Sequence, residues 1–357
     1  MRVINKDNNK APTKRMTLKA VADALGVSTA SISNAFNRPD QLSAVLRDRI
    51  LKECERLGYH GPNPAARSLR TGATGVVGVM LAERLAYNFR DSCATEFLQG
   101  VAEVLDDARV NLLLMPGRDD FYHQQSMESI PDRFIIYGPP RDLGIIQRLE
   151  RQHKPVVTVD FTLGNHLSLN IDNYGGAKQA AQHIYRQIGS DAAVAVIGLR
   201  LIHSDAVGRV SEVELIDAAT SISRQRLDAY RDAAAEFGSE ILADQVWNTH
   251  ESNWSDGVKA AREALLCEPR PKALFCMSDQ LALAALSVAR DLDIRVPEDL
   301  KIVGFDDISE ARRAHPAITT VYQPSIEKGR LAAMMALDPE RFKSQILPTQ
   351  LQIRETA

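Results

Sequence analysis

The 357-residue sequence has few cysteines, no long apolar run and no recognisable export signal. Its four cysteines, Cys54, Cys93, Cys267 and Cys276, lack C-x-x-C spacing, which argues against a disulfide framework or a zinc site. No apolar run reaches the roughly eighteen residues that span a bilayer, and the start MRVINKDNNKAPTKR lacks the apolar stretch of a secretory signal. We therefore expect a cytoplasmic protein with reduced thiols and no bound metal.

Motifs for catalysis and cofactor binding are also missing. The segment GVVGVM lacks the G-x-G-x-x-G phosphate pattern, no G-x-S-x-G occurs, and the eight histidines form no H-x-x-x-H pair. Asp306 and Asp307 are adjacent, but neighbouring residues of a strand point to opposite faces and cannot both act on one substrate bond. The sequence predicts neither an enzyme nor a cofactor-binding protein.

Charge is unevenly distributed along the chain. Residues 1–72 contain 13 Lys and Arg against 6 Asp and Glu, a balance of +7, whereas the remainder carries −10. Basic side chains neutralise phosphates and release counterions from a duplex, while an acidic body is repelled by it. This distribution is typical of a nucleic-acid-binding head on an ordinary soluble domain.

Three stretches within residues 16–57 have apolar residues at helical spacing. These positions are Leu18, Val21, Ala22 and Leu25, then Ile32 and Phe36, then Leu46, Ile50, Cys54 and Leu57. Gly26 suits the positive φ at the end of a first helix, and Ser28 can cap a second one. The pattern predicts two helices joined by a tight turn, with a third helix completing a small core.

The second helix would expose Thr29, Ala30, Ser33 and Asn34, whose short side chains let a backbone approach base edges in the major groove. A generic three-helix bundle is the alternative interpretation. The motifs T-L-K-x-V-A-x-x-L-G-V-S-x-x-S-I-S-N-A-F-N, R-I-L-x-x-x-x-x-L-G-Y and A-A-R-S-L-R-T-G favour the first one. Together they resemble the lactose/galactose repressor family of bacterial transcription regulators.

This resemblance implies roles for individual residues of the head. Thr29, Ala30 and Asn34 would read base edges, and Thr17, Ser28, Ser33 and Asn37 would position the helix on the DNA backbone. Asn34 stands where the family commonly has arginine. Arginine matches guanine and asparagine matches adenine, so we expect a different base at that point of the half-site.

Residues 62–73 resemble the family's hinge helix. The resemblance implies that two such helices of a dimer pack together in the minor groove. Leu69 would then wedge between the central base pairs, and Ala66 would face its symmetry mate. The other expected hinge residues are Asn63, Arg67 and Arg70. An isolated helix this short is marginal in water, so we expect it to order only on DNA or against a second hinge. The alternative for Leu69 is an ordinary apolar linker residue. The stretch Tyr59–Asn63 is one residue longer than the usual family spacing.

From residue 74 onward, short apolar strands alternate with helical segments, which implies parallel sheets covered by helices. This part resembles the family's sensor, which shares its fold with periplasmic sugar-binding proteins: two doubly wound parallel-sheet subdomains with ligand between them. The expected fold is therefore an all-α helix-turn-helix head plus this α/β sensor. The expected boundaries are a tail at 1–16, the head at 17–61, the hinge at 62–73 and the sensor at 74–357, with an N-subdomain at 74–172 and 323–335 and a C-subdomain at 173–322 and 336–357.

Polar residues after strands are the candidates for a cleft between the subdomains. Matches to the family give Asp160, Arg226, Trp254, Ser278, Asp306 and Gln323. A guanidinium, carboxylates and an indole suit a neutral polyhydroxylated ligand, a sugar or polyol, although they could also clamp a nucleoside or purine. Arg226 and Asp306 could instead form a structural ion pair, and Trp254 could be core. Ser278 replaces a frequent asparagine of the family, which weakens any transfer of a particular sugar.

The sequence thus predicts a ligand-responsive DNA-binding regulator, a repressor, that acts as a homodimer on a pseudo-palindromic operator. The alternative of another class is a solute-binding receptor with no DNA role, which should carry an export signal and no basic head. Whether the ligand releases or strengthens DNA binding stays open. The connection 200–222 is longer than usual for the family and is either a lid or a surface insertion.

Overall fold

The computed structural model describes residues 16–61, 72–117, 130–140, 144–215 and 221–357, and the chain divides into two compact units, residues 1–74 and 75–357. In the first unit the helices are α1 (Leu18–Leu25), α2 (Thr29–Asn37) and α3 (Ala44–Arg56), with a 3-10 turn at Pro39–Gln41. The side chains of Thr17, Ser28 and Ser43 each accept a hydrogen bond from a backbone N–H in the first turn of the helix that follows. These caps satisfy donors that have no partner inside a helix, which is why the helices begin there.

The core of this unit is small. Its buried apolar side chains are Val21, Ala22, Leu25, Ile32, Ala35, Ile50, Cys54 and Tyr59. Leu18, Phe36, Leu46 and Leu57 pack around them and are partly buried. Gly26 has a φ of 63° and ends α1, a conformation that costs glycine little. The predicted helix-turn-helix with a supporting third helix therefore describes this unit well.

The second unit contains two sheets, each made mainly of parallel strands. The first has the order β12-β5-β4-β3-β1-β2, and all of its pairs are parallel. Its strands are β1 (Val76–Leu81), β2 (Asn111–Pro116), β3 (Arg133–Tyr137), β4 (Val156–Val159), β5 (Leu167–Ile171) and β12 (Gln345–Leu347). We call the part of the chain built on this sheet the N-subdomain.

The second sheet has the order β13-β11-β10-β9-β6-β8-β7 and defines the C-subdomain. Its strands are β6 (Val194–Leu199), β7 (Gly208–Arg209), β8 (Val246–Thr249), β9 (Ala273–Cys276), β10 (Lys301–Asp306), β11 (Thr319–Tyr322) and β13 (Gln350–Gln352). The two edge strands, β7 and β13, pair antiparallel with their neighbours. The sheet is thus doubly wound as predicted, with antiparallel edges that the sequence pattern did not indicate.

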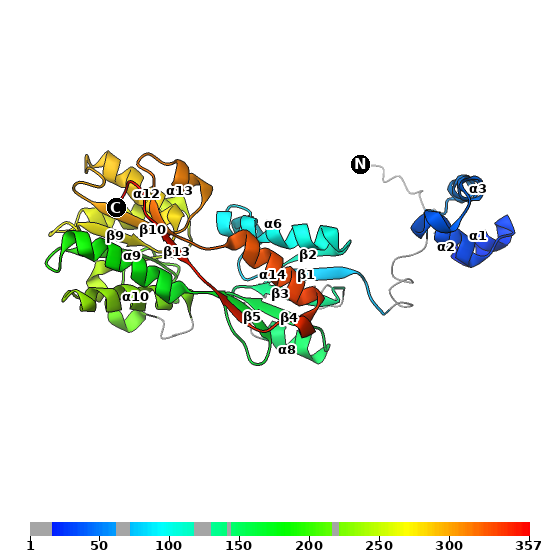
Figure 1. The fold of residues 1–357 in the computed structure, drawn as a ribbon, viewed down its shortest axis with the longest axis horizontal. Helices are drawn as coiled ribbons and strands as arrows, with labels where there is room; N and C mark the ends of the chain where they lie inside the picture. The colour runs from blue at the N-terminus through cyan, green and yellow to red at the C-terminus, as the bar shows by residue number, and fades with distance from the viewer. Residues whose placement is uncertain (1–15, 62–71, 118–129, 141–143, 216–220) are drawn as a thin grey trace, which may run out of the picture. The chain divides into compact units, whose positions relative to one another are not determined.

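Helices cover both faces of each sheet (Figure 1). They are α5 (Leu85–Asn88), α6 (Ser92–Asp107), α8 (Gly144–Arg151), α9 (Asn173–Ile188), α10 (Ile222–Glu236), α11 (Trp254–Leu265), α12 (Asp279–Asp291), α13 (Ser309–Arg313) and α14 (Ser325–Leu337). On the N-subdomain sheet, α6 and α14 share one core and α8 contributes to the other. On the C-subdomain sheet, α9 and α10 lie over one face and α11 and α12 over the other. This layering accounts for the strands' nearly continuous apolar runs, because both of their faces are buried.

The chain passes between the subdomains three times, after β5, after β11 and between β12 and β13 (Figure 1). The sequence predicts that the chain returns to the C-subdomain at residues 335–336. This prediction is wrong, because α14 is followed by β12, which pairs with β5 of the N-subdomain. Phe342 and Leu347 pack against the N-subdomain core, so the chain remains there until Leu347. The passage lies at residues 348–349, and β13 then joins the C-subdomain sheet.

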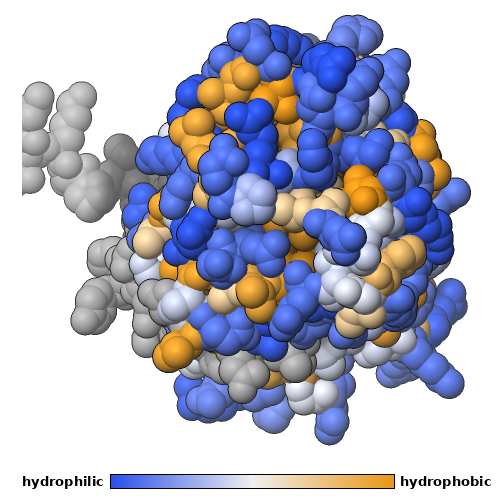
Figure 2. Space-filling view, turned by 90° about the vertical axis from the view of Figure 1, so that its left-hand side faces the viewer, coloured by the Kyte–Doolittle hydropathy of each residue, from blue (hydrophilic) through white to orange (hydrophobic). Residues whose placement is uncertain are grey.

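The end of the C-subdomain that faces the viewer in Figure 2 is mostly hydrophilic, with hydrophobic residues in separate groups between polar ones. Among the helices that the structure describes, none combines the length and apolar character needed to cross a membrane. Over the same residues, no cluster of three or more His, Cys, Asp and Glu side chains could hold a metal ion.

Candidate functional site

The helix expected to read DNA is α2. Its cap Ser28 and its first residues Thr29 and Ala30 are exposed, and Asn34 is partly exposed beyond them. Ile32 and Ala35, on the opposite side, are buried in the core of the unit. The helix is therefore anchored by one face and presents the predicted residues on the other.

The expected positioning residues surround this exposed face. Asn37 donates from Nδ2 to the carbonyl oxygen of Ser33, 2.9 Å away, at the end of α2. Thr17 lies at the exposed start of α1. The expected hinge residues Asn63, Ala66, Arg67, Leu69 and Arg70 lie outside the described residues.

A cavity of about 120 Å³ lies between the two subdomains. Its lining is Asp91, Cys93, Tyr137, Asp160, Ile171, Leu199, Ile222, Arg226, Ser252, Met277, Ser278, Asp306 and Gln323. Five of the six predicted effector residues are in this set, drawn from both subdomains and from the connection between β11 and α14. We call it the inner cavity.

Arg226 of α10 is held in a fixed orientation. Its Nε and Nη2 donate to Asn173 Oδ1 at 3.0 and 2.9 Å, its Nη1 donates to the carbonyl of Met277, and its guanidinium lies 3.4 Å from the Phe305 ring centroid. Only 5% of the residue is exposed. A guanidinium clamped in this way presents its remaining N–H groups to the cavity without losing further rotamer freedom.

Asp306 at the end of β10 faces this arginine, with its Oδ1 4.0 Å from Arg226 Nη1. The same oxygen accepts a hydrogen bond from Gln323 Nε2 at 2.6 Å. Burial raises the pKa of Asp306 to about 7, despite the opposing effect of Arg226. Its φ of 120° is costly for a residue other than glycine, and such strain is found mostly at functional sites.

The neighbouring Asp307 points elsewhere, as the adjacency of the two residues indicated. Its carboxylate pairs with Arg354 at 2.6 Å and Arg312 at 3.0 Å, outside the inner cavity. One carboxylate therefore serves the cavity and the other ties β10 to the C-terminal segment.

Asp160 forms an ion pair with a buried lysine that the sequence pattern did not predict. Lys328 of α14 is 1% exposed, and its Nζ lies 2.8 and 3.0 Å from the two oxygens of Asp160 and 3.1 Å from Gln323 Oε1. Through Gln323 the chain of polar contacts continues to Asp306 and Arg226. The two subdomains are thus linked through the floor of the cavity.

The C-subdomain also contributes hydroxyl groups. Ser278 Oγ accepts from the backbone N–H of Leu281 at the start of α12, and Ser252 Oγ donates to it at 2.7 Å. Ser278 therefore acts both as a helix cap and as part of the cavity wall.

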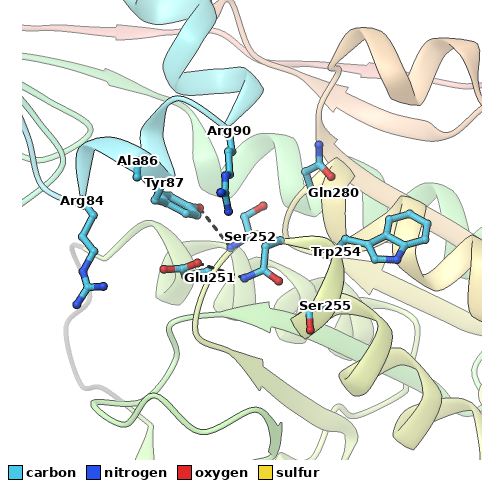
Figure 3. Close-up of a pocket in the computed structure, with 10 residues that line it drawn as sticks. Arg84, Ala86, Tyr87, Arg90, Glu251, Ser252, Trp254, Ser255 and Gln280 are labelled. Atoms are coloured by element: carbon cyan, nitrogen blue, oxygen red, sulfur yellow. Dashed lines mark hydrogen bonds between the residues drawn. The ribbon is translucent and has the colours of Figure 1, made fainter.

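Trp254 lies apart from the other five predicted residues. It is 51% exposed and lines a second, larger cavity of about 580 Å³ together with Arg84, Ala86, Tyr87, Arg90, Glu251, Ser252, Asn253, Ser255 and Gln280 (Figure 3). We call this the outer cavity. Ser252 lines both, so the two adjoin at that residue. The alternative of Trp254 as a core residue is wrong, because half of its surface is accessible.

Direct contacts hold the subdomains together beside these cavities. Arg200 Nη1 lies 2.7 Å from Glu83 Oε1, and its guanidinium carbon lies 5.6 Å from the centroid of the Tyr87 ring. The Tyr87 hydroxyl accepts a hydrogen bond from the backbone N–H of Ser252 at 3.3 Å. Glu83 and Tyr87 belong to the N-subdomain, so any change in the angle between subdomains must alter these contacts.

The connection 200–222 folds onto the edge of the C-subdomain. Gly208 and Arg209 form β7 against β8, and Leu201, Val210 and Leu215 are buried in the core beside α9 and α10. Of its described residues, only Ile222, already part of α10, lines either cavity. The described part of this segment thus adds a two-residue strand to the sheet edge and packs on the core of the C-subdomain.

Comparisons with known proteins agree with this geometry. The model of the periplasmic binding protein-like domain matches residues 210–357. An HTH-type transcriptional regulator of Mycolicibacterium smegmatis is 35% identical over 92% of this chain and 92% of its own length. The chain belongs to the lactose repressor family of transcription regulators.

Solved structures of that family have the same fold. The transcriptional regulator CelR in complex with cellobiose superposes with a TM-score of 0.68 at 28% identity, over 96% of this chain and all of the other. A LacI-family regulator from Corynebacterium glutamicum gives a TM-score of 0.69 at 26% identity, over 96% and 99%. Relatives of this kind are regulators rather than enzymes, consistent with the missing catalytic motifs.

Several residues of the inner cavity were not predicted. Tyr137 is the last residue of β3, so the rule of polar groups at strand ends would have indicated it. Asp91 caps α6 by accepting from the N–H groups of Cys93 and Ala94, which is a signal of helix start and not of ligand binding. Lys328, which contacts the lining residues Asp160 and Gln323 but is not itself part of the lining, gives no signal, because a lysine within a helix is normally exposed.

Proposed function

We propose that this protein is a repressor whose affinity for its operator is set by a small polyhydroxylated effector bound in the inner cavity. The observation that carries the proposal is the convergence of Asp160, Arg226, Ser278, Asp306 and Gln323 on one cavity between two subdomains. These groups come from five separate elements, and packing alone does not require their side chains to meet.

The chemistry of the lining favours a neutral ligand with several hydroxyl groups. Carboxylates accept hydrogen bonds from hydroxyls, and the clamped guanidinium donates to them. Vicinal hydroxyls satisfy both kinds of group, whereas the carboxyl groups of Asp91, Asp160 and Asp306 offer an anion few donors. The cellobiose complex of the related CelR supports a carbohydrate. A nucleoside or purine, which Tyr137 could stack against, is the second candidate.

On the DNA side, we propose that Thr29, Ala30 and Asn34 contact base edges and that Thr17, Ser28, Ser33 and Asn37 contact the sugar-phosphate backbone. A homodimer would place two such heads on a pseudo-palindromic site, with Asn63, Ala66, Arg67, Leu69 and Arg70 at the minor groove between them. Action on chromosomal DNA makes the cytoplasm the expected location.

The two activities would be coupled by the angle between the subdomains. An effector that binds across the cleft stabilises one angle over another, and it changes DNA affinity only if the two states bind it differently. The contacts of Arg200 with Glu83 and Tyr87 are candidates for interactions that differ between these states.

Calorimetry and thermal shift test the effector site together. The full-length protein is screened against sugars, polyols and nucleosides, because a ligand of the native state raises the melting temperature. Arg226→Ala and Asp306→Ala should then each lose about 2 kcal/mol or more of binding free energy. Phe89→Ala, an exposed residue outside both cavities, is the control. Two folded variants that bind the ligand like the parent would place the effector elsewhere.

A further inference from the structure

One ion pair joins the two subdomains directly. Arg200, which follows β6 of the C-subdomain, donates from Nη1 to Oε1 of Glu83 in the N-subdomain at 2.7 Å. The other ion pairs found between residues that the structure describes lie within the head or within a single subdomain. Removing this one pair therefore weakens the contact between the subdomains and leaves the ion pairs inside each of them intact.

The C-subdomain fixes Arg200 at its backbone and along its side chain. The backbone N–H donates to the carbonyl oxygen of Thr249 at 2.8 Å, and Nε donates to the carbonyl oxygen of His250 at 3.0 Å. With Nε bound there, the guanidinium can reach Glu83 with little further loss of rotamer freedom. Arg200 also has a φ of 52°, a left-handed conformation that costs an arginine more than a glycine. Strain of this kind is found mostly at binding sites and switch regions.

The N-subdomain presents its half of the contact from one tight turn. Asn88 is 3% exposed, and its Nδ2 donates to the carbonyl oxygens of Glu83 and of the next residue at 3.2 and 3.0 Å. The same turn carries Tyr87, whose ring centroid lies 5.6 Å from the guanidinium carbon of Arg200, within the range of a cation–π contact. The Tyr87 hydroxyl accepts from the backbone N–H of Ser252 in the C-subdomain (Figure 3). Each half of the contact is thus fixed within its own subdomain.

Partial burial separates this pair from an ordinary surface ion pair. The side chains of Arg200 and Glu83 are 33% and 14% exposed, so water and salt screen their attraction only in part. Surface pairs contribute little because two free side chains must be ordered, whereas here the arginine is already held at Nε. Neither residue lines the inner cavity, so the pair can form while that cavity is empty.

We infer that Glu83 and Arg200 form a latch that holds the two subdomains at this angle in the absence of effector. The strength of the latch sets how often the cleft opens in the effector-free protein. Through the subdomain angle it also sets the affinity of the effector-free protein for its operator. This last step rests on the proposed function, whereas the latch itself concerns only the two subdomains.

Cys93 is a native reporter of opening. It lines the inner cavity between the subdomains and is 7% exposed, so a thiol reagent reaches it mainly when the subdomains separate. Cys276 is fully buried in the core of the C-subdomain, so its labelling reports unfolding instead. The full chain is treated with N-ethylmaleimide, and mass spectrometry of the two cysteine peptides gives both labelling rates from one sample.

Two variants remove the latch in different ways. Glu83→Gln keeps the shape of the side chain and removes its charge, and Arg200→Gly removes the side chain at a position whose φ suits glycine. In each variant Cys93 should be labelled about five-fold faster than in the parent or more, because a partly buried, charged hydrogen bond is lost. The Cys276 rate should stay unchanged. The double variant should be no faster than the faster single variant, because both changes remove the same interaction.

Glu103→Gln is the matched control. Glu103 lies on α6, the helix that carries Cys93, and pairs with Arg330 at the same N–O distance of 2.7 Å, but both partners belong to the N-subdomain. This variant should leave both labelling rates unchanged. Operator titrations without effector then use the same proteins. Glu83→Gln and Arg200→Gly should change the Kd by roughly five-fold or more in the same direction, and Glu103→Gln should not change it.

The outcomes separate the latch from the proposed function. If Cys93 is labelled no faster than in the parent in either variant, or if Cys276 accelerates equally, the latch is wrong and the proposed function stands. If Cys93 is labelled faster in both variants while the operator Kd stays that of the parent, the latch holds the subdomains, and the proposed coupling between their angle and DNA binding fails.

Discussion

Asp306 offers the sharpest physical test of the inner cavity, because the folded protein should hold this carboxyl far from its ordinary titration range. Its pKa rises from 3.8 to about 7, mainly because burial disfavours the charged form. Two cations face Asp306, Arg226 and Lys328, and both oppose the rise in its pKa. Two carboxyl groups also face it: Asp91 adds to the rise, and Asp279 has its own pKa raised by Asp306. Substitution by asparagine keeps the shape and removes the titration.

The sign follows from comparing folded and unfolded chains. Between about pH 4 and pH 7 the unfolded state has an ionised Asp306 while the folded state keeps it protonated, so the folded parent loses stability as the pH rises through this window. Each pKa unit corresponds to about 1.4 kcal/mol. From a pKa of 3.8 unfolded and about 7 folded, the parent should lose about 2–3 kcal/mol between pH 5 and pH 8 relative to Asp306→Asn.

Urea unfolding followed by tryptophan fluorescence measures this difference. Both tryptophans, Trp247 and Trp254, belong to residues 75–357, so the signal follows the unit that contains the cavity. The gain in stability of Asp306→Asn over the parent should increase steadily from pH 5 to pH 8. A gain that is the same at every pH, or one that decreases as the pH rises, would refute the assignment of a buried, protonated Asp306.

Three further predictions concern other parts of the chain. Asn34→Arg should change the base preferred at one position of each half-site from adenine to guanine, as binding-site selection with both proteins would reveal; identical preferences would remove Asn34 from the base-reading set. Leu69→Ala should weaken specific DNA binding by at most a few kcal/mol and spare non-specific binding, whereas neutralising Arg67 and Arg70 should flatten the salt dependence of binding. Operator titrations at several salt concentrations separate the two effects. A Leu69→Ala variant that binds the operator like the parent would argue against a wedge. Lys328→Met should lower the free energy of unfolding by about 3–5 kcal/mol, because it leaves Asp160 buried without its cation. Adding Asp160→Leu to Lys328→Met should restore much of this free energy. A Lys328→Met variant as stable as the parent in thermal melts would show that the ion pair does not contribute to stability.

The alternation of apolar strands and helices was enough to predict the sheets, because strands buried on both faces must be apolar throughout. Short edge strands are different. β12 has a pattern of partial burial, and β7 has only two residues, so neither shows the periodicity that identifies a strand. For this reason the third passage between the subdomains was placed about a dozen residues too early.

The inner cavity was predictable where its residues follow strands and much less so elsewhere. Asp160 follows β4 of the N-subdomain and Asp306 ends β10 of the C-subdomain, and in each sheet the carboxyl ends of the parallel strands lie at one edge. Asp91 reaches the cavity from the N-cap of α6, and Lys328 of α14 contacts the lining residues Asp160 and Gln323; segments far apart in sequence bring both groups here. Trp254 was predicted from its match to the family, but the match did not indicate that it lies at the start of α11, after the cap Asn253, in a different cavity from the other five residues.

The central claim is that occupancy of the cavity controls binding to DNA, and fluorescence anisotropy of a labelled operator measures this directly. The operator is selected with the parent protein, and the titration is repeated with and without saturating effector, for the parent and for Arg226→Ala. A coupling of about 1–3 kcal/mol would change the parent's Kd by roughly 5- to 150-fold, in one direction or the other. Arg226→Ala should bind the free operator like the parent and should not respond to the same effector concentration. A parent Kd that stays the same although calorimetry shows the effector bound, or an Arg226→Ala variant that responds like the parent, would contradict the account.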